Sequence, residues 1–62
     1  MQFYRLYAKF EGQKRFEALD LSTGGQVKNL IYATMIPAEN LPKVEAIIKD
    51  NPEIEFKVVP IK

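Results

Sequence analysis

The sequence predicts an α+β domain with the order β-β-β-α-β, in which a four-stranded, mostly antiparallel sheet carries one helix on one face. Residues 2–10 and 53–61 alternate between apolar and polar side chains, as half-buried strands do. Between them lies a stripe of apolar residues with helical spacing, and glycines and prolines separate the segments. The 62 residues allow a single domain, spanning 1–62, with one small core.

The first predicted strand, residues 2–10, has two chemically different faces. Its even positions form an apolar face: Tyr4, Leu6, Ala8 and Phe10. Its odd positions form a mixed face: Phe3, Arg5, Tyr7 and Lys9. Because successive side chains point to opposite sides of a strand, we expect the even set to face the core.

A hairpin is predicted next, because Gly12 occupies the first central position of the loop 11–14, as a type II′ turn requires. The second strand would span residues 15–21. A two-residue loop fixes the register, which pairs Leu6 with Leu19, Tyr4 with Leu21, Arg5 with Asp20 and Lys9 with Phe16.

Residues 22–26 predict a second short connection, because Gly24 and Gly25 can adopt left-handed geometry. The most apolar stretch, residues 27–36, is then expected to be a third strand that is covered on at least part of both faces. Pro37 would end this strand, since proline has no N–H for the ladder.

One helix is predicted from the stripe Leu41, Val44, Ile47 and Ile48. Asn40 is the expected N-cap, and Pro42 suits the first turn, where its missing N–H would be unpaired anyway. We expect Asn51, in left-handed geometry, and Pro52 to end the helix. A final strand over residues 53–61 follows.

The topology follows from these connections. If the first three strands form a meander, the helix crosses over the sheet and brings the last strand back parallel to the third and first strands. The last strand then lies beside the first, which gives the strand order 3-2-1-4. One helix covers one face of this sheet and leaves the other face for function.

The composition excludes most enzyme chemistry. The chain has no His and no Cys, and its 9 Lys and Arg against 8 Asp and Glu give a net charge of +1. We therefore expect no enzyme, no catalytic residue, no cofactor and no metal site. The loop 22–25 matches no phosphate-binding motif, and the carboxylates of Glu53 and Glu55 are expected to solvate an edge strand rather than to form a site.

The candidate interaction face combines aromatic and basic side chains on the first hairpin: Phe3, Arg5, Tyr7, Lys9, Lys14 and Phe16. We expect it to serve a small non-catalytic accessory or protein-interaction module, which binds a protein partner or self-associates through its sheet. The alternative is weak binding of single-stranded nucleic acid, whose bases stack on aromatic rings while cations follow the phosphates. The low net charge favours the first interpretation.

The segment 14–37 resembles small uncharacterised proteins encoded by bacterial phages and conjugative elements. The resemblance implies a bacterial, cytoplasmic setting and no particular activity, and it assigns no functional residue. A cytoplasmic location also agrees with Arg5 and Lys9, which interrupt the apolar run that a signal peptide would need. No window reaches the roughly 20 apolar residues of a membrane span, so no membrane partner is expected.

Overall fold

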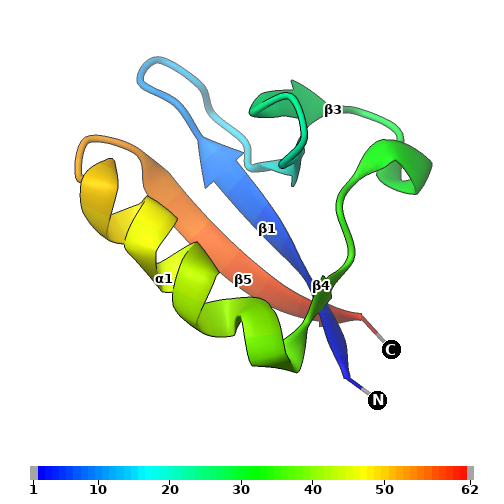
Figure 1. The fold of residues 1–62 in the computed structure, drawn as a ribbon. Helices are drawn as coiled ribbons and strands as arrows, with labels where there is room; N and C mark the ends of the chain where they lie inside the picture. The colour runs from blue at the N-terminus through cyan, green and yellow to red at the C-terminus, as the bar shows by residue number, and fades with distance from the viewer. Residues whose placement is uncertain (1, 62) are drawn as a thin grey trace.

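The computed structural model describes residues 2–61, which form a five-stranded antiparallel sheet with one helix packed on one face (Figure 1). The strands are β1 (Phe3–Lys9), β2 (Glu17–Asp20), β3 (Gly25–Val27), β4 (Ile36–Pro37) and β5 (Glu55–Ile61). The helix is α1 (Leu41–Asp50), and two single 3₁₀ turns are η1 (Leu30–Tyr32) and η2 (Ala38–Asn40). The predicted α+β class is confirmed.

The strand β1 organises the sheet, because it is paired along both of its edges. β5 pairs with it from Phe3 to Lys9 along one edge. The other edge is shared by β2, which pairs at Tyr7 and Ala8, and by β4, which pairs at Phe3 and Tyr4. The predicted order is confirmed, with β3, β2, β1 and the final strand side by side and β4 as a short additional strand.

The direction of the last strand differs from the prediction. The expected parallel pairing with the first strand is wrong, because β5 pairs with β1 antiparallel. The reason is a chain reversal between β3 and β4, since β3 runs parallel to β1 whereas β4 runs antiparallel to it. The helix therefore connects two parallel strands, β4 and β5, that lie on either side of β1.

The predicted third strand over residues 27–36 is also wrong. Its ladder ends at Val27, and the chain then forms η1. The side chain of Asn29 accepts a hydrogen bond of 3.1 Å from the backbone N–H of Ile31 and so caps this turn. Asparagine offers the backbone a local partner in place of a ladder bond, and here that local bond prevails over the apolar content of the segment.

The first hairpin has the predicted register but a different turn. Tyr7 faces Ala18 and Ala8 faces Glu17, as expected. The type II′ prediction is wrong, because the N–H of Gln13 bonds the carbonyl of Phe10, which makes Gly12, at φ +87°, the second central residue. Residues 14–16 are therefore extra residues between the turn and β2, and β2 is shorter than predicted.

The helix begins at Leu41 and ends at Asp50, as predicted, but its caps differ. Asn40 is the N-cap by position and makes no side-chain cap bond, because η2 leads directly into the helix. The expected left-handed Asn51 is wrong, since its φ is −129°. Its side-chain amide instead donates a hydrogen bond of 2.8 Å to the carbonyl of Ile47, which satisfies a group at the helix end.

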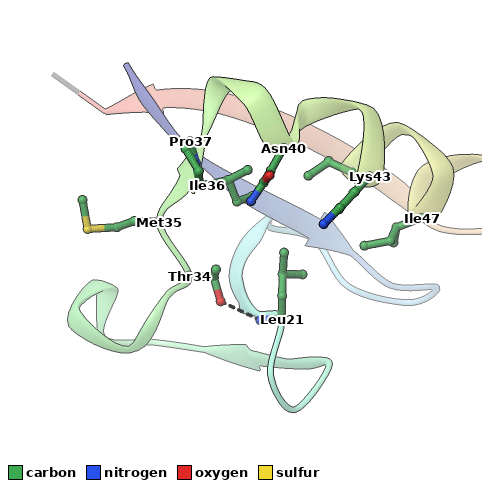
Figure 2. A pocket seen from close by; sticks show the side chains of 9 residues that line it. Leu21, Thr34, Met35, Ile36, Pro37, Asn40, Lys43 and Ile47 are labelled. Atoms are coloured by element: carbon green, nitrogen blue, oxygen red, sulfur yellow. Dashed lines mark hydrogen bonds between the residues drawn. The ribbon is translucent and has the colours of Figure 1, made fainter. Parts of the chain in front are cut away.

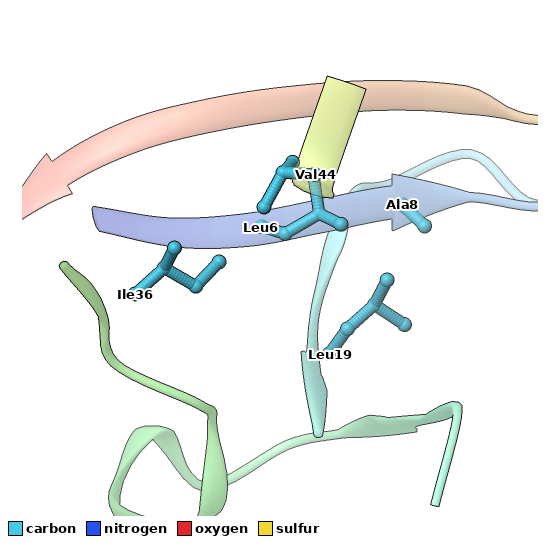
Figure 3. Packing of buried hydrophobic residues seen from close by; sticks show 5 residues of the cluster. All are labelled: Leu6, Ala8, Leu19, Ile36 and Val44. Atoms are coloured by element: carbon cyan, nitrogen blue, oxygen red, sulfur yellow. The ribbon is translucent and has the colours of Figure 1, made fainter. Parts of the chain in front are cut away.

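The core lies between the helix and the even face of β1, as predicted. Its buried members come from four elements, and Figure 3 shows them converging: Leu6, Ala8, Leu19, Ile36 and Val44. Partly buried side chains that surround them include Tyr4, Phe10, Leu41 and Ile48. The helix covers only part of the sheet, so both the opposite face and the margin beside the helix remain as candidate surfaces.

Candidate interaction surfaces

The first candidate surface is the outer face of the sheet, opposite the helix. The structure places the side chains of Phe3, Arg5, Tyr7 and Lys9 together there, half-buried in one row along β1. Phe16 is also half-buried, next to the end of this row, where Lys9 lies over its ring. Lys14 is exposed in the loop between β1 and β2, outside the ladder.

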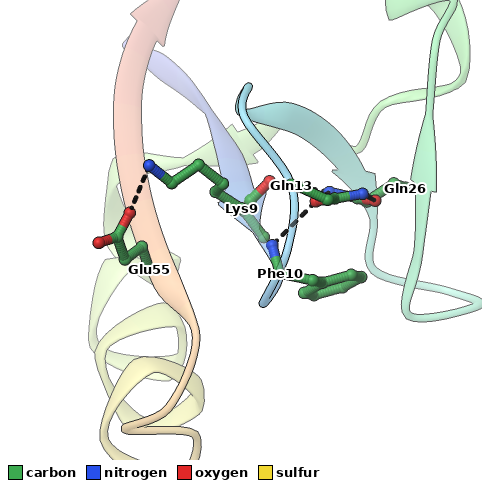
Figure 4. A network of polar contacts seen from close by, with 6 residues as sticks. Lys9, Phe10, Gln13, Gln26 and Glu55 are labelled. Carbon is green, nitrogen blue, oxygen red and sulfur yellow. Dashed lines mark hydrogen bonds and ion pairs between the residues drawn. The ribbon is translucent and has the colours of Figure 1, made fainter.

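A cluster of cations and rings occupies one end of this face. The Nζ atoms of Lys9 and Lys57 lie 5.3 Å and 4.9 Å from the centre of the Phe16 ring. Lys57 also lies 5.8 Å from the centre of the Tyr7 ring. Figure 4 shows that Lys9 is ion-paired with Glu55 at 2.9 Å. Two of the rings on this face, those of Tyr7 and Phe16, thus already lie next to the chain's own cations.

Arg5 and Asp20 do not form the ion pair that the sequence suggested. The Nε atom of Arg5 is buried without a hydrogen-bond partner among residues 2–61. The Asp20 carboxylate instead accepts hydrogen bonds from the Ser22 hydroxyl, at 2.6 Å, and from the Ser22 backbone N–H, at 2.9 Å. These bonds from Ser22 lower the pKa of Asp20. The loop 22–25 is therefore organised around a carboxylate, which disfavours an anion there.

The second candidate surface is an apolar strip that the sequence analysis missed. Its members lie on and after η1 and are 43% to 77% exposed: Leu30, Ile31, Tyr32 and Met35. Reading residues 27–36 as a buried strand concealed them. The signal that could have revealed them was Asn29, a helix-capping residue type placed directly before the apolar run.

An apolar groove adjoins this strip, between α1 and the edge of the core. It consists of two cavities of about 220 Å³ and 240 Å³, and Leu21 and Ile47 line both of them. Met35 belongs both to the lining of the first cavity and to the exposed strip. Figure 2 shows its side chain at the outer end of the cavity, pointing away from Leu21 and Ile47. Thr34 fixes this edge, because its hydroxyl accepts a hydrogen bond of 2.8 Å from the Leu21 N–H.

No group of three His, Cys, Asp or Glu side chains within residues 2–61 is arranged to hold a metal ion. Glu55, one of the two neighbouring carboxylates near the C-terminal end, is engaged by Lys9. No helix in the described part of the chain is long and apolar enough to cross a membrane.

Comparison with family models, with curated proteins and with solved structures gives no match to this chain.

Proposed function

We propose that the chain is a small non-catalytic protein-interaction module. The observation that carries this proposal is the apolar strip of Leu30, Ile31, Tyr32 and Met35, with Ile31 77% exposed. Single exposed apolar residues are ordinary, but several adjoining ones next to an apolar groove are typical of a protein-binding surface. The strip projects on a short turn and the groove is concave, so a partner can bury both together.

The chemistry of the strip suits a protein better than other ligands. An aromatic residue, Tyr32, and a methionine, Met35, are among the types enriched at the centres of interfaces. Thr34 and Asn29 hold the strip in place through hydrogen bonds, which reduces the entropy lost on binding. In the bacterial setting that the resemblance implies, such a module would act as an accessory subunit.

The alternative, binding of single-stranded nucleic acid, is less well supported. Stacking needs free ring faces and free cations, yet Lys9 and Lys57 lie over Phe16, and Glu55 neutralises Lys9. Titrating the protein with an oligonucleotide while following tyrosine fluorescence tests this alternative. Quenching that weakens as the salt concentration rises would favour it over the protein-binding proposal.

Site-specific crosslinking tests the proposed function. A photo-crosslinking amino acid at position 31 should give a discrete adduct with one protein in a bacterial lysate or with a second copy of the chain. The matched control carries the same amino acid at position 45, because Glu45 is exposed on α1, away from the strip. Equal adduct patterns at both positions would count against the proposal.

A further inference from the structure

The strand β5 has a free edge. Within residues 2–61 it pairs only with β1, along its whole length from Glu55 to Ile61. Its other edge therefore presents backbone donors and acceptors without strand partners. Edges of this kind pair readily with another strand, and natural proteins use them for association.

Pro60 indicates which backbone groups face this edge. Proline is tolerated in an edge strand where its nitrogen points away from the ladder. Backbone groups two residues apart point to the same side of a strand, so Phe56 and Val58 share the orientation of Pro60. The N–H and C=O groups of Phe56 and Val58 thus face outward and can pair, whereas Pro60 contributes no donor.

We propose that a second copy of the chain pairs its β5 antiparallel to this edge, with the two-fold axis at Phe56. This dimer rests on the proposed function, because it assumes that the chain binds protein, and it identifies a second copy of the chain as one partner. The edge of β5 is a different surface from the apolar strip, so the dimer and the proposed function can be disproved independently of each other.

Charge complementarity selects the register. With the axis at Phe56, each Glu55 lies opposite Lys57 of the second copy, and this pair occurs twice. Lys9 lies 2.9 Å from the Oε2 atom of Glu55, whose side chain is still 64% exposed and so accessible to a second cation. Lys57 has no carboxylate partner among the described residues and contacts only rings. Each Glu55 would then lie between two lysines.

Two neighbouring registers that the outward groups allow are less favourable. An axis at Lys57 would pair Phe56 with Val58 of the second copy, but it would place the two Lys57 side chains opposite each other. An axis at Val58 would place Phe56 opposite Pro60 of the second copy, so the missing N–H would remove two hydrogen bonds from the dimer. It would also place Lys57 opposite Val59 and Glu55 opposite Ile61, without opposite charges facing each other. In the register at Phe56, Val58 lies opposite Ile54, whose N–H already donates to the carbonyl of Asn51 at 3.1 Å. This register is nevertheless the one of the three that pairs opposite charges, and it does so twice.

Charge reversal tests the proposal. In the E55K variant two lysines would face each other, and in K57E two glutamates would do so. Each variant alone should weaken self-association about tenfold or more, because both charge pairs become repulsive. An equimolar mixture of the two variants should form a heterodimer. The introduced lysine at position 55 of E55K then faces the introduced glutamate at position 57 of K57E, and the unchanged Lys57 of E55K faces the unchanged Glu55 of K57E. Analytical ultracentrifugation measures both effects.

Matched controls separate this effect from a general change of charge. E39K and K28E make the same reversals at exposed positions outside β5 and should dimerise like the wild type. Circular dichroism of every variant establishes that it is folded. A wild type that stays monomeric up to roughly 1 mM would overturn the proposal and leave the crosslinking result at position 31 unaffected. Single variants that dimerise as the wild type does would also overturn it.

Cysteine pairs test the register directly, because the chain has no Cys of its own. A mixture of E55C and K57C should form a disulfide-linked heterodimer, since directly opposite residues lie about 4.5 Å to 5.5 Å apart, within disulfide range. Either variant alone should remain largely uncrosslinked. A mixture of K57C and V59C reports the alternative axis at Val58, and preferential crosslinking of that mixture would overturn the proposed register.

Discussion

Gln13 and Gln26 exchange hydrogen bonds through their side-chain amides, although they belong to different hairpins. The Nε2 atom of each donates to the Oε1 atom of the other, at 2.7 Å and 2.8 Å. Gln26 also donates to the carbonyl of Ala8 at 2.9 Å, and Gln13 accepts from the N–H of Phe10 at 2.8 Å (Figure 4). This network ties the short strand β3 and the first loop to the end of β1.

The variant Gln26→Ala should lower the free energy of unfolding by about 1 to 2 kcal/mol, because it removes the amide pair and leaves the partly buried Ala8 carbonyl without its donor. Urea denaturation measures this loss. The control, Gln13→Ala, retains the bond from Gln26 to Ala8 and should cost less. A larger loss of unfolding free energy for Gln13→Ala than for Gln26→Ala would show that the bond from Gln26 to the Ala8 carbonyl is not the main contribution.

The variant Leu6→Ala should lower the free energy of unfolding by about 2 to 5 kcal/mol, because Leu6 is 1% exposed at the centre of the core. At about 0.05 to 0.15 kcal/mol per residue, that is a large share of the stability of a 62-residue chain. Ile31→Ala removes a similar apolar volume from the exposed strip and should change the unfolding free energy by no more than about 0.5 kcal/mol. Thermal melts of both variants compare the two sites, and equal losses would contradict the assigned burial.

The variant Ser22→Ala should raise the pKa of Asp20 toward its ordinary value. The Ser22 hydroxyl stabilises the charged carboxylate, which lowers the pKa of Asp20 in the folded state. This stabilisation is present above the unfolded-state pKa and is lost as the pH falls through the lower, folded-state pKa. The variant should therefore be less stable than the wild type above the unfolded-state pKa, and this difference should vanish as the pH falls through the folded-state pKa. NMR titration of Asp20 gives the pKa, and Ser22→Thr, which keeps a hydroxyl, should behave like the wild type.

The variant Gly24→Ala should destabilise the β2–β3 hairpin by about 1 to 2 kcal/mol. Gly24 has a φ of +76° and open space where a Cβ would lie, so the cost is conformational strain alone. Gly25 is the matched control. It lies in β3, where it pairs with Asp20 of β2, and its φ is not positive. A Cβ at Gly25 would lie 3.5 Å from the Thr23 hydroxyl, which is an ordinary contact. Gly25→Ala should be close to neutral. Equal costs for the two variants would point to crowding instead of backbone geometry.

The parts of the fold that were predicted correctly depend on strong periodic patterns. The alternation in β1 and the stripe on α1 each turn a set of apolar residues to one side, so packing these two sides together satisfies both patterns. The register of the first hairpin was predicted from a two-residue loop and is confirmed, although the turn type was wrong and the turn lies one residue earlier. Residues 14–16 absorb the difference, because they lie outside the ladder.

The errors arose where apolar content was used without periodicity. Residues 27–36 are apolar but do not alternate, and one local hydrogen bond, from the Ile31 N–H to the Asn29 side chain, redirects them. That turn reverses the chain, which also changed the direction of the last strand. The candidate face on β1 was brought together as the alternation implied. Its occupation by Lys57 could not be predicted, because the antiparallel pairing of β5 places that lysine over the rings.

The pairing of β1 with β5 also determines when this sheet can fold. β1 is the first strand of the described residues, and its longest ladder is formed with the last of them. Contacts between residues so far apart in sequence slow folding, because a long loop must close before they form. While the chain is being synthesised, β1 lacks that ladder and Leu6 lacks much of its cover. The complete sheet can therefore assemble only after Glu55–Ile61 has left the ribosome.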